Sequence, residues 1–180
     1  LSAEDGHGNN TAIGYQTLKA QNAGADAYNV AVGHQAGLLV STGLQNVIVG
    51  GLAGDALTSG HYNVAVGYGA LSTEDAHGRN VAIGYKALNT QNAGANAYNV
   101  AMGYKAGFAI STGIQNTLIG GYAGDALAGG SNNVAIGGYA LSTEDTHGKN
   151  VAVGYGALTL QDAGADAYNV AIGYLAGTNV

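Results

Sequence analysis

Three observations predict an all-β chain folded as a β-solenoid. A five-residue motif, Asn-[Val/Thr]-[Ala/Ile/Leu]-[Val/Ile/Met]-Gly, recurs ten times at intervals of 17 or 19 residues. Glycine supplies 32 of the 180 residues, far above average usage, and proline is absent. A unit of 17 residues is too short for a β-α-β crossover, which needs about 30. The unit therefore fits one coil of a solenoid, in which every coil adds a short strand.

The coils are grouped at a second level. Residues 10–79 align without gaps on residues 80–149, and 44 of these 70 positions are identical. We therefore expect residues 1–180 to form a single repeat domain of about ten coils of 17–19 residues, in 70-residue blocks, as a segment of a longer fibre. The coils begin at Asn10, Asn29, Asn46, Asn63, Asn80, Asn99, Asn116, Asn133, Asn150 and Asn169.

Each position of the motif has an expected role. Side chains alternate between the two faces of a strand, so in Val100-Ala101-Met102 we expect the bulky outer pair to fill the space between two sheets of the coil. The central alanine then faces outward, where another surface can approach. Stacked asparagines predict a ladder in which each side-chain amide bonds to the amides above and below. Proline would remove a backbone donor from the stack, which explains its absence.

Glycine closes each motif, where we expect a corner with positive φ or a close approach of two backbones. The predicted corner glycines are Gly14, Gly33, Gly50, Gly67, Gly84, Gly103, Gly120, Gly137, Gly154 and Gly173. In the third coil of each block the central alanine is replaced by Ile48 or Leu118, and the residue after the corner becomes Gly51 or Gly121. This exchange predicts that the two positions share space.

The segments NVAIGYKAL (80–88), NVAVGYGAL (63–71 and 150–158) and NTAIGYQTL (10–18) carry a family resemblance. They resemble the head repeats of YadA-like trimeric autotransporter adhesins, and they are similar to the NTAIGYQAL-type repeats of bacteriophage tail fibres. The resemblance covers essentially the whole chain. It implies a left-handed parallel β-roll, three chains packed as a homotrimer, and an extracellular adhesive or receptor-binding rod on a virion or a bacterial cell surface.

Composition excludes several function classes. The net charge of −6 and the scarcity of Lys and Arg argue against nucleic-acid binding, because phosphate recognition needs a basic surface. No apolar run approaches the roughly 20 residues that span a bilayer, so membrane insertion is not expected. Cysteine is absent, and the chain has no catalytic motif of the nucleophile-elbow, zinc-protease or P-loop type. We expect no enzymatic activity and no cofactor.

The sharpest polar cluster is Glu-Asp-x-His in the fourth coil of each block. A carboxylate beside an imidazole can bind a transition metal, so these residues are weak metal candidates, against the alternative of a solvated loop. The candidates are Glu74, Asp75 and His77, and Glu144, Asp145 and His147; Glu4-Asp5-Gly6-His7 repeats the pattern before the first motif asparagine. Calcium is disfavoured, because Asp55 and Asp125 recur only once in four coils and cannot share an ion between neighbouring turns.

Exposed tyrosines are the candidate contact residues for a host-surface glycan or protein receptor, because aromatic faces stack on sugars. Tyr28, Tyr98 and Tyr168 occupy equivalent places before a motif asparagine, where they could equally brace the loop. The alternatives are a self-assembling extracellular filament, an ice-binding solenoid and a non-catalytic scaffold of a larger enzyme. Ice binding is disfavoured because the threonines fall at different offsets in different coils.

Overall fold

The computed structural model describes residues 3, 8–74, 76–144, 146–162 and 164–179. Within these residues the chain forms ten strands and no helix. The strands are β1 (Thr11–Ile13), β2 (Val30–Val32), β3 (Val47–Val49), β4 (Val64–Val66), β5 (Val81–Ile83), β6 (Val100–Met102), β7 (Thr117–Ile119), β8 (Val134–Ile136), β9 (Val151–Val153) and β10 (Val170–Ile172).

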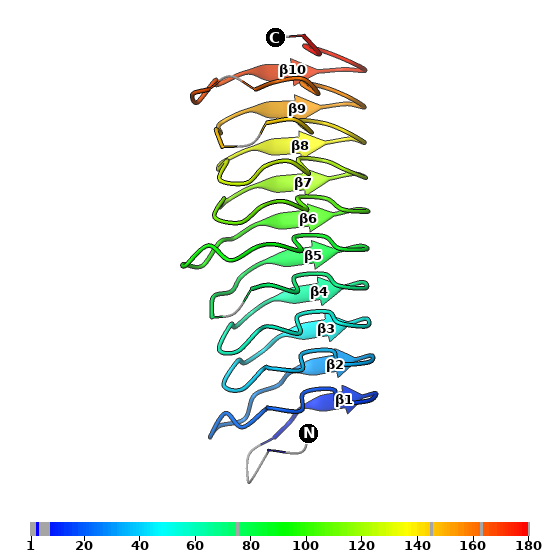
Figure 1. Ribbon diagram of the computed structural model, residues 1–180, viewed down its shortest axis with the longest axis vertical. Coiled ribbons are helices and arrows are strands. Elements are labelled where there is room, and N and C mark those ends of the chain that lie inside the picture. Colours follow the sequence, from blue (N-terminus) through cyan, green and yellow to red (C-terminus); the bar gives the residue numbers. More distant parts are fainter. Residues whose placement is uncertain (1–2, 4–7, 75, 145, 163, 180) are drawn as a thin grey trace.

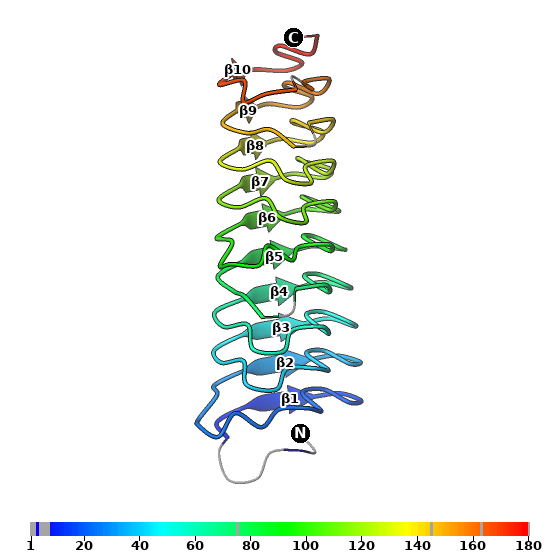
Figure 2. The same cartoon turned by 60° about the vertical axis from the view of Figure 1, so that its left-hand side comes forward.

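All ten strands belong to one parallel sheet, in which each strand pairs with the next along the chain. The register matches first residue to first and central residue to central; Val81, Ala82 and Ile83 of β5, for example, pair with Val100, Ala101 and Met102 of β6. The strands follow one another along a single stack, with β1 and β10 at opposite ends (Figures 1 and 2). The β-solenoid predicted from the repeat is confirmed.

The opposite side of each coil departs from the two-sheet expectation. The residues after each corner glycine form turns, and no second sheet is present in the described residues. In these turns the second and fourth residues after the glycine have positive φ, as in Lys86 (φ 53°) and Leu88 (φ 46°). A side chain in this left-handed region costs about 1–2 kcal/mol, so the turn must be held by what surrounds it.

The expected orientation of the strand residues is wrong. The central residue of the strand, which is alanine except for Ile48 and Leu118, is buried in β2 to β10, whereas the residues on either side are exposed or half-exposed. The physical reason is the thinness of the coil. The interior also holds the large aliphatic side chains of the turns, so the inward strand position is alanine in eight of the ten coils, and the bulkier valine and isoleucine on either side of it point outward.

Two further interior positions of the coil complement each other in size. The fourth residue after the corner glycine is either Leu, as in Leu88, or Gly, as in Gly107. Where it is Leu, the buried residue three places later is Gln or Glu, as in Gln91; where it is Gly, that residue is Val, Leu or Ile, as in Ile110. Each of the first nine coils therefore places one large aliphatic side chain at one of these two positions.

The prediction that the positions of Ile48 and Gly51 share space is wrong. The Ile48 side chain is fully buried, whereas a Cβ at Gly51 would lie 3.4 Å from the exposed ring of Tyr68. The two positions thus do not share space. Ile48 instead packs toward Gly37 and Gly54, since its Cδ1 lies 3.0 and 3.5 Å from where a Cβ would stand at each.

The motif asparagines lie one above another, but their bonding differs from the expected amide-to-amide ladder. At all nine steps the side-chain Oδ1 of one asparagine accepts a hydrogen bond from the backbone N–H of the next, at 2.8–3.1 Å. Bonds between side-chain amides are also present from Asn46 to Asn29 and from Asn116 to Asn99. Because the side chains of Asn29 to Asn150 are buried, the ladder fixes coil spacing away from solvent.

The ten corner glycines all have φ between 131° and 145°. A Cβ added at Gly84 would stand 2.3 Å from the carbonyl oxygen of Gly103 in the next coil. Positive φ and close backbone approach, which the sequence offered as alternatives, therefore occur together at this corner.

Candidate interaction surface

The outward face of the sheet is an uncharged and mostly apolar strip. It consists of the first and third residues of every strand, and these are only Thr, Val, Ile and Met. Ile13, Met102, Ile119 and Ile136 are among the exposed large apolar side chains. We call these two columns the sheet face; they carry no charge over the length of the ten strands.

One edge of the sheet face is formed by tyrosines that follow the corner glycines. Consecutive rings contact each other from coil to coil, and we call this row the tyrosine ladder; its members are Tyr68, Tyr85, Tyr104, Tyr122, Tyr139, Tyr155 and Tyr174. In two coils the residue after the corner is Gly121 or Gly138, and the tyrosine stands one position later. The row nevertheless continues through Tyr122 and Tyr139.

Ring geometry varies along the tyrosine ladder. The Tyr85–Tyr104 and Tyr122–Tyr139 pairs are stacked, with ring centroids 5.1 Å apart in both. Tyr104 and Tyr122 are tilted by 59° at 5.2 Å. The pKa of Tyr122 is raised, mainly because the phenol loses water and secondly because of its hydrogen bond with Tyr104.

The other edge is formed by the residue before each motif asparagine. These residues are exposed and have positive φ, and they include Tyr28, Gln45, Tyr62, Arg79, Tyr98, Gln115, Asn132, Lys149 and Tyr168. The predicted contact residues Tyr28, Tyr98 and Tyr168 therefore lie in one column. At least half of the surface of each residue is exposed. Sequence reasoning omitted Tyr62, which occupies the same column; its place before Asn63 is the signal that would have found it.

Arg79 occupies the space between two of these tyrosines. Its guanidinium carbon lies 5.6 Å from the ring centroid of Tyr62 and 5.5 Å from that of Tyr98, and its Nη1 donates to the Tyr98 hydroxyl at 2.8 Å. Such cation–π contacts stabilise exposed sites by about 0.5–1 kcal/mol. One face of each ring is thus engaged within the chain, which favours a bracing role for Tyr62 and Tyr98.

Lys149 takes the place of Arg79 in the next block. Its Nζ lies 2.7 Å from Asp166 Oδ2 and donates to the Tyr168 hydroxyl at 3.0 Å. The hydrogen bond from Lys149 lowers the pKa of Asp166. The Oδ1 atoms of Asp166 and of its counterpart Asn96 accept from the backbone N–H of Gly148 and Gly78 respectively, so both residues tie a long loop to the coil before it.

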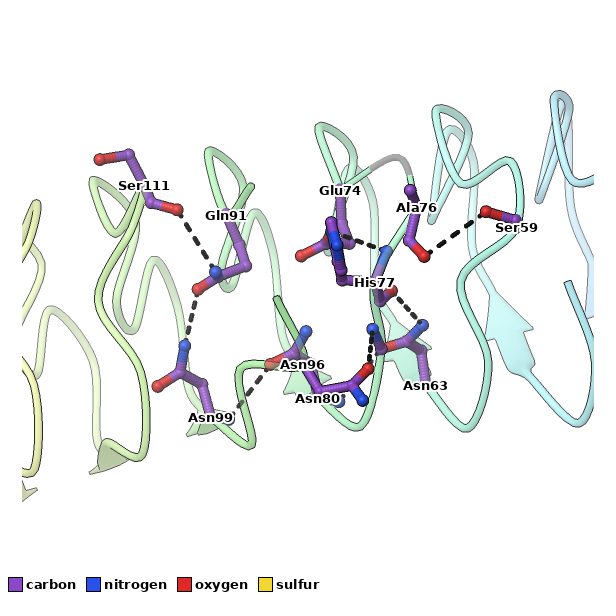
Figure 3. A network of polar contacts seen from close by, with 11 residues as sticks. Ser59, Asn63, Glu74, Ala76, His77, Asn80, Gln91, Asn96, Asn99 and Ser111 are labelled. Atoms are coloured by element: carbon purple, nitrogen blue, oxygen red, sulfur yellow. Dashed lines mark hydrogen bonds and ion pairs between the residues drawn. The ribbon is translucent and has the colours of Figure 1, made fainter. Parts of the chain in front are cut away.

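The weak metal candidates are split between the interior and the surface. Glu74 and Glu144 are fully buried, and each Oε1 accepts a hydrogen bond from the backbone N–H of His77 or His147. The imidazole Nδ1 of His77 lies 3.7 Å from the same oxygen (Figure 3). Asp75 and Asp145 lie outside the described residues. Among the residues that are described, no group of three His, Cys, Asp or Glu side chains could hold a metal ion.

Asp55 and Asp125, considered above for calcium, are partly buried at equivalent places. Burial raises the pKa of both carboxyl groups, and each Oδ1 is buried without a hydrogen-bond partner. Lys105 opposes this shift in the pKa at Asp125. Between the ordinary pKa and the raised one the folded chain binds more protons than the unfolded chain, so stability falls as pH rises through that window.

The raised pKa of these two partly buried carboxyl groups predicts how stability depends on pH. We expect Asp55→Asn to raise the urea midpoint at pH 7, above the ordinary carboxyl pKa of 3.8, and to lose this advantage below that pKa. Asp125→Asn should gain less, because Lys105 partly compensates its charge. The exposed Asp162→Asn is the control. An equal gain for all three variants would contradict the burial argument.

Comparisons of the chain with family models, with curated proteins and with solved structures give no match. No helix capable of crossing a membrane is found in the part of the chain that the structure describes. The class that the fold defines is a parallel β-solenoid with a 70-residue superrepeat.

Proposed function

We propose that this chain is a rigid segment of an extracellular fibre, of the kind found in phage tail fibres and bacterial surface adhesins, and that it assembles with two copies of itself. The observation that carries the proposal is the sheet face, an uncharged strip of exposed Val, Ile, Met and Thr as long as the stack. Contiguous apolar surfaces of this extent mark interfaces in soluble proteins. The repeat resemblance supports three chains in a left-handed roll.

The remaining surface fits a spacer that can also contact a host. The asparagine ladder and the paired backbones at the corners resist bending, since every coil bonds to the next along its length. The column that contains Tyr28 and Tyr168 borders the sheet face and stays accessible when copies associate through that face. A glycan or protein receptor would meet this column.

Mass measurement of the purified chain in solution tests the assembly. We expect light scattering after size exclusion to give three times the chain mass of 17.7 kDa. Val81→Glu, which puts a carboxylate on the sheet face, should shift the mass toward one chain because burying an unpaired charge is unfavourable. Ala95→Glu, in an exposed loop of the same coil, should leave the mass unchanged.

Two outcomes would overturn the assembly. One is a single-chain mass for the parent protein at micromolar concentration. The other is an unaltered mass for a Val81→Glu variant whose circular dichroism shows a folded chain. Receptor contact is tested separately, by comparing adsorption of the parent and of Tyr28→Ala and Tyr168→Ala variants to host cells.

A further inference from the structure

We propose that the tyrosine ladder is a site of oxidative cross-linking, at which a one-electron oxidant of the peroxidase class joins neighbouring phenols of one chain into dityrosine. The inference is independent of the proposed fibre function, because it depends only on the contacts between rings of successive coils. Its product would be a covalent bond between coils whose other covalent connection is the backbone of 17 or 19 residues.

Proximity is the first argument. Six consecutive ring contacts link Tyr68 to Tyr174, with centroid separations of 5.1–5.8 Å. Every contact joins two different coils. A radical formed on any of these rings therefore has an oxidisable neighbour in van der Waals range, so that coupling does not wait for two molecules to meet.

The composition directs oxidation to these rings. Cysteine and tryptophan are absent from the chain, and Met102 is its single methionine. Phenols are therefore the main groups that a one-electron oxidant can attack. The rings are also accessible: Tyr85 is 39% exposed and Tyr155 is 51% exposed.

The chemistry balances with a peroxide as the terminal oxidant. Each of two phenols loses one electron and one proton, giving two phenoxyl radicals. A carbon–carbon bond forms between their ortho carbons, and the two ortho hydrogens move to the oxygens as the rings regain aromaticity. The two electrons and two protons released reduce one hydrogen peroxide to two waters through the peroxidase.

Geometry selects the pairs. Tyr85–Tyr104 and Tyr122–Tyr139 combine the shortest separation with interplanar angles of 9° and 10°. Tyr139–Tyr155 is edge-on at 70° and 5.8 Å, so the ortho carbons are less well placed. We therefore expect cross-links at the two stacked pairs first. Tyr28, in the other column, has no tyrosine ring in contact within the described residues, and it serves as the comparison site.

The experiment treats the folded, full chain with a plant peroxidase and hydrogen peroxide. Dityrosine fluorescence gives the yield, and mass spectrometry of peptides from mixed light and ¹⁵N-labelled chains identifies the pairs. We expect products joining Tyr85 to Tyr104 and Tyr122 to Tyr139 within one chain. In 6 M urea this selectivity should be lost.

Two variants make the outcome decisive. Tyr104→Phe keeps a ring in the stack but removes a phenol, so the Tyr85–Tyr104 product should disappear while the Tyr122–Tyr139 product remains. Tyr28→Phe should leave both products unchanged. The proposal is overturned if cross-links form chiefly between chains, or if Tyr28 enters products as often as Tyr85 does.

Discussion

Replacing the corner glycine Gly120 by alanine is expected to prevent the coils around it from stacking. The added Cβ would lie 2.5 Å from the carbonyl oxygen of Gly137 in the next coil, where no flexible side chain can move aside. Gly120 also has φ +137°, a conformation that side chains rarely adopt. The two effects together should lower the free energy of unfolding by about 3 kcal/mol or more, the range of strongly disruptive changes.

The next residue provides a matched control. Gly121 has no positive φ, and a Cβ there would meet nothing closer than the Tyr104 carbonyl oxygen at 4.0 Å. Most other coils place Tyr or His at this position, as Tyr85 and His34 show. Gly121→Ala should therefore be neutral or slightly stabilising, because it lowers the entropy of the unfolded chain.

Urea denaturation followed by circular dichroism, at one protein concentration, compares the two variants. Similar midpoints for Gly120→Ala and Gly121→Ala would show that the corner tolerates a side chain, and that the approach of the two backbones does not determine the glycine pattern. A loss of structure confined to Gly120→Ala would assign the glycine requirement to the corner itself.

The repeat period could be predicted from the sequence because identical coils must place equivalent residues in register. Asn80, Gly84 and Ala87 recur at fixed offsets, and each has a position-specific role in the stack. Which face points inward could not be predicted from the strand alone. In Val81-Ala82-Ile83 the alternation is equally clear in either orientation, and only the turns that pack beneath the sheet decide that alanine is buried.

The candidate surface was predicted less completely than the fold. The tyrosine after each corner glycine is visible in the repeat, but at Tyr122 and Tyr139 it moves by one residue, and only the folded turn brings these rings back into line. The cation between Tyr62 and Tyr98 is also hidden, because Arg79 belongs to a different coil from each tyrosine and only the stacking of the coils brings the three side chains together.

The second large effect is expected inside the coil, at Leu118. Its side chain is fully buried, and truncation to alanine leaves a cavity, so Leu118→Ala should lower the free energy of unfolding by about 2–5 kcal/mol. Gly124→Ala should destabilise the parent by a smaller amount, because the new Cβ would stand 2.8 Å from Leu118 Cδ2 and 2.7 Å from Leu127 Cδ1.

Combining the two changes distinguishes shared volume from independent defects. Coil eight already pairs Ala135 with Leu141, so alanine in the strand is compatible with a larger residue in the turn, and Leu141 has a φ of 53° close to the 56° of Gly124. The loss of unfolding free energy in the double variant should therefore be smaller than the sum of the two single losses. The expected difference is about 0.5–3 kcal/mol, the usual coupling between contacting residues. Gly54→Ala, four coils away, should combine additively with Leu118→Ala. If the effect of Leu118→Ala adds to that of Gly124→Ala just as it adds to that of Gly54→Ala, the two positions in one coil do not compete for space. The alternation of leucine and glycine along the stack would then need another cause.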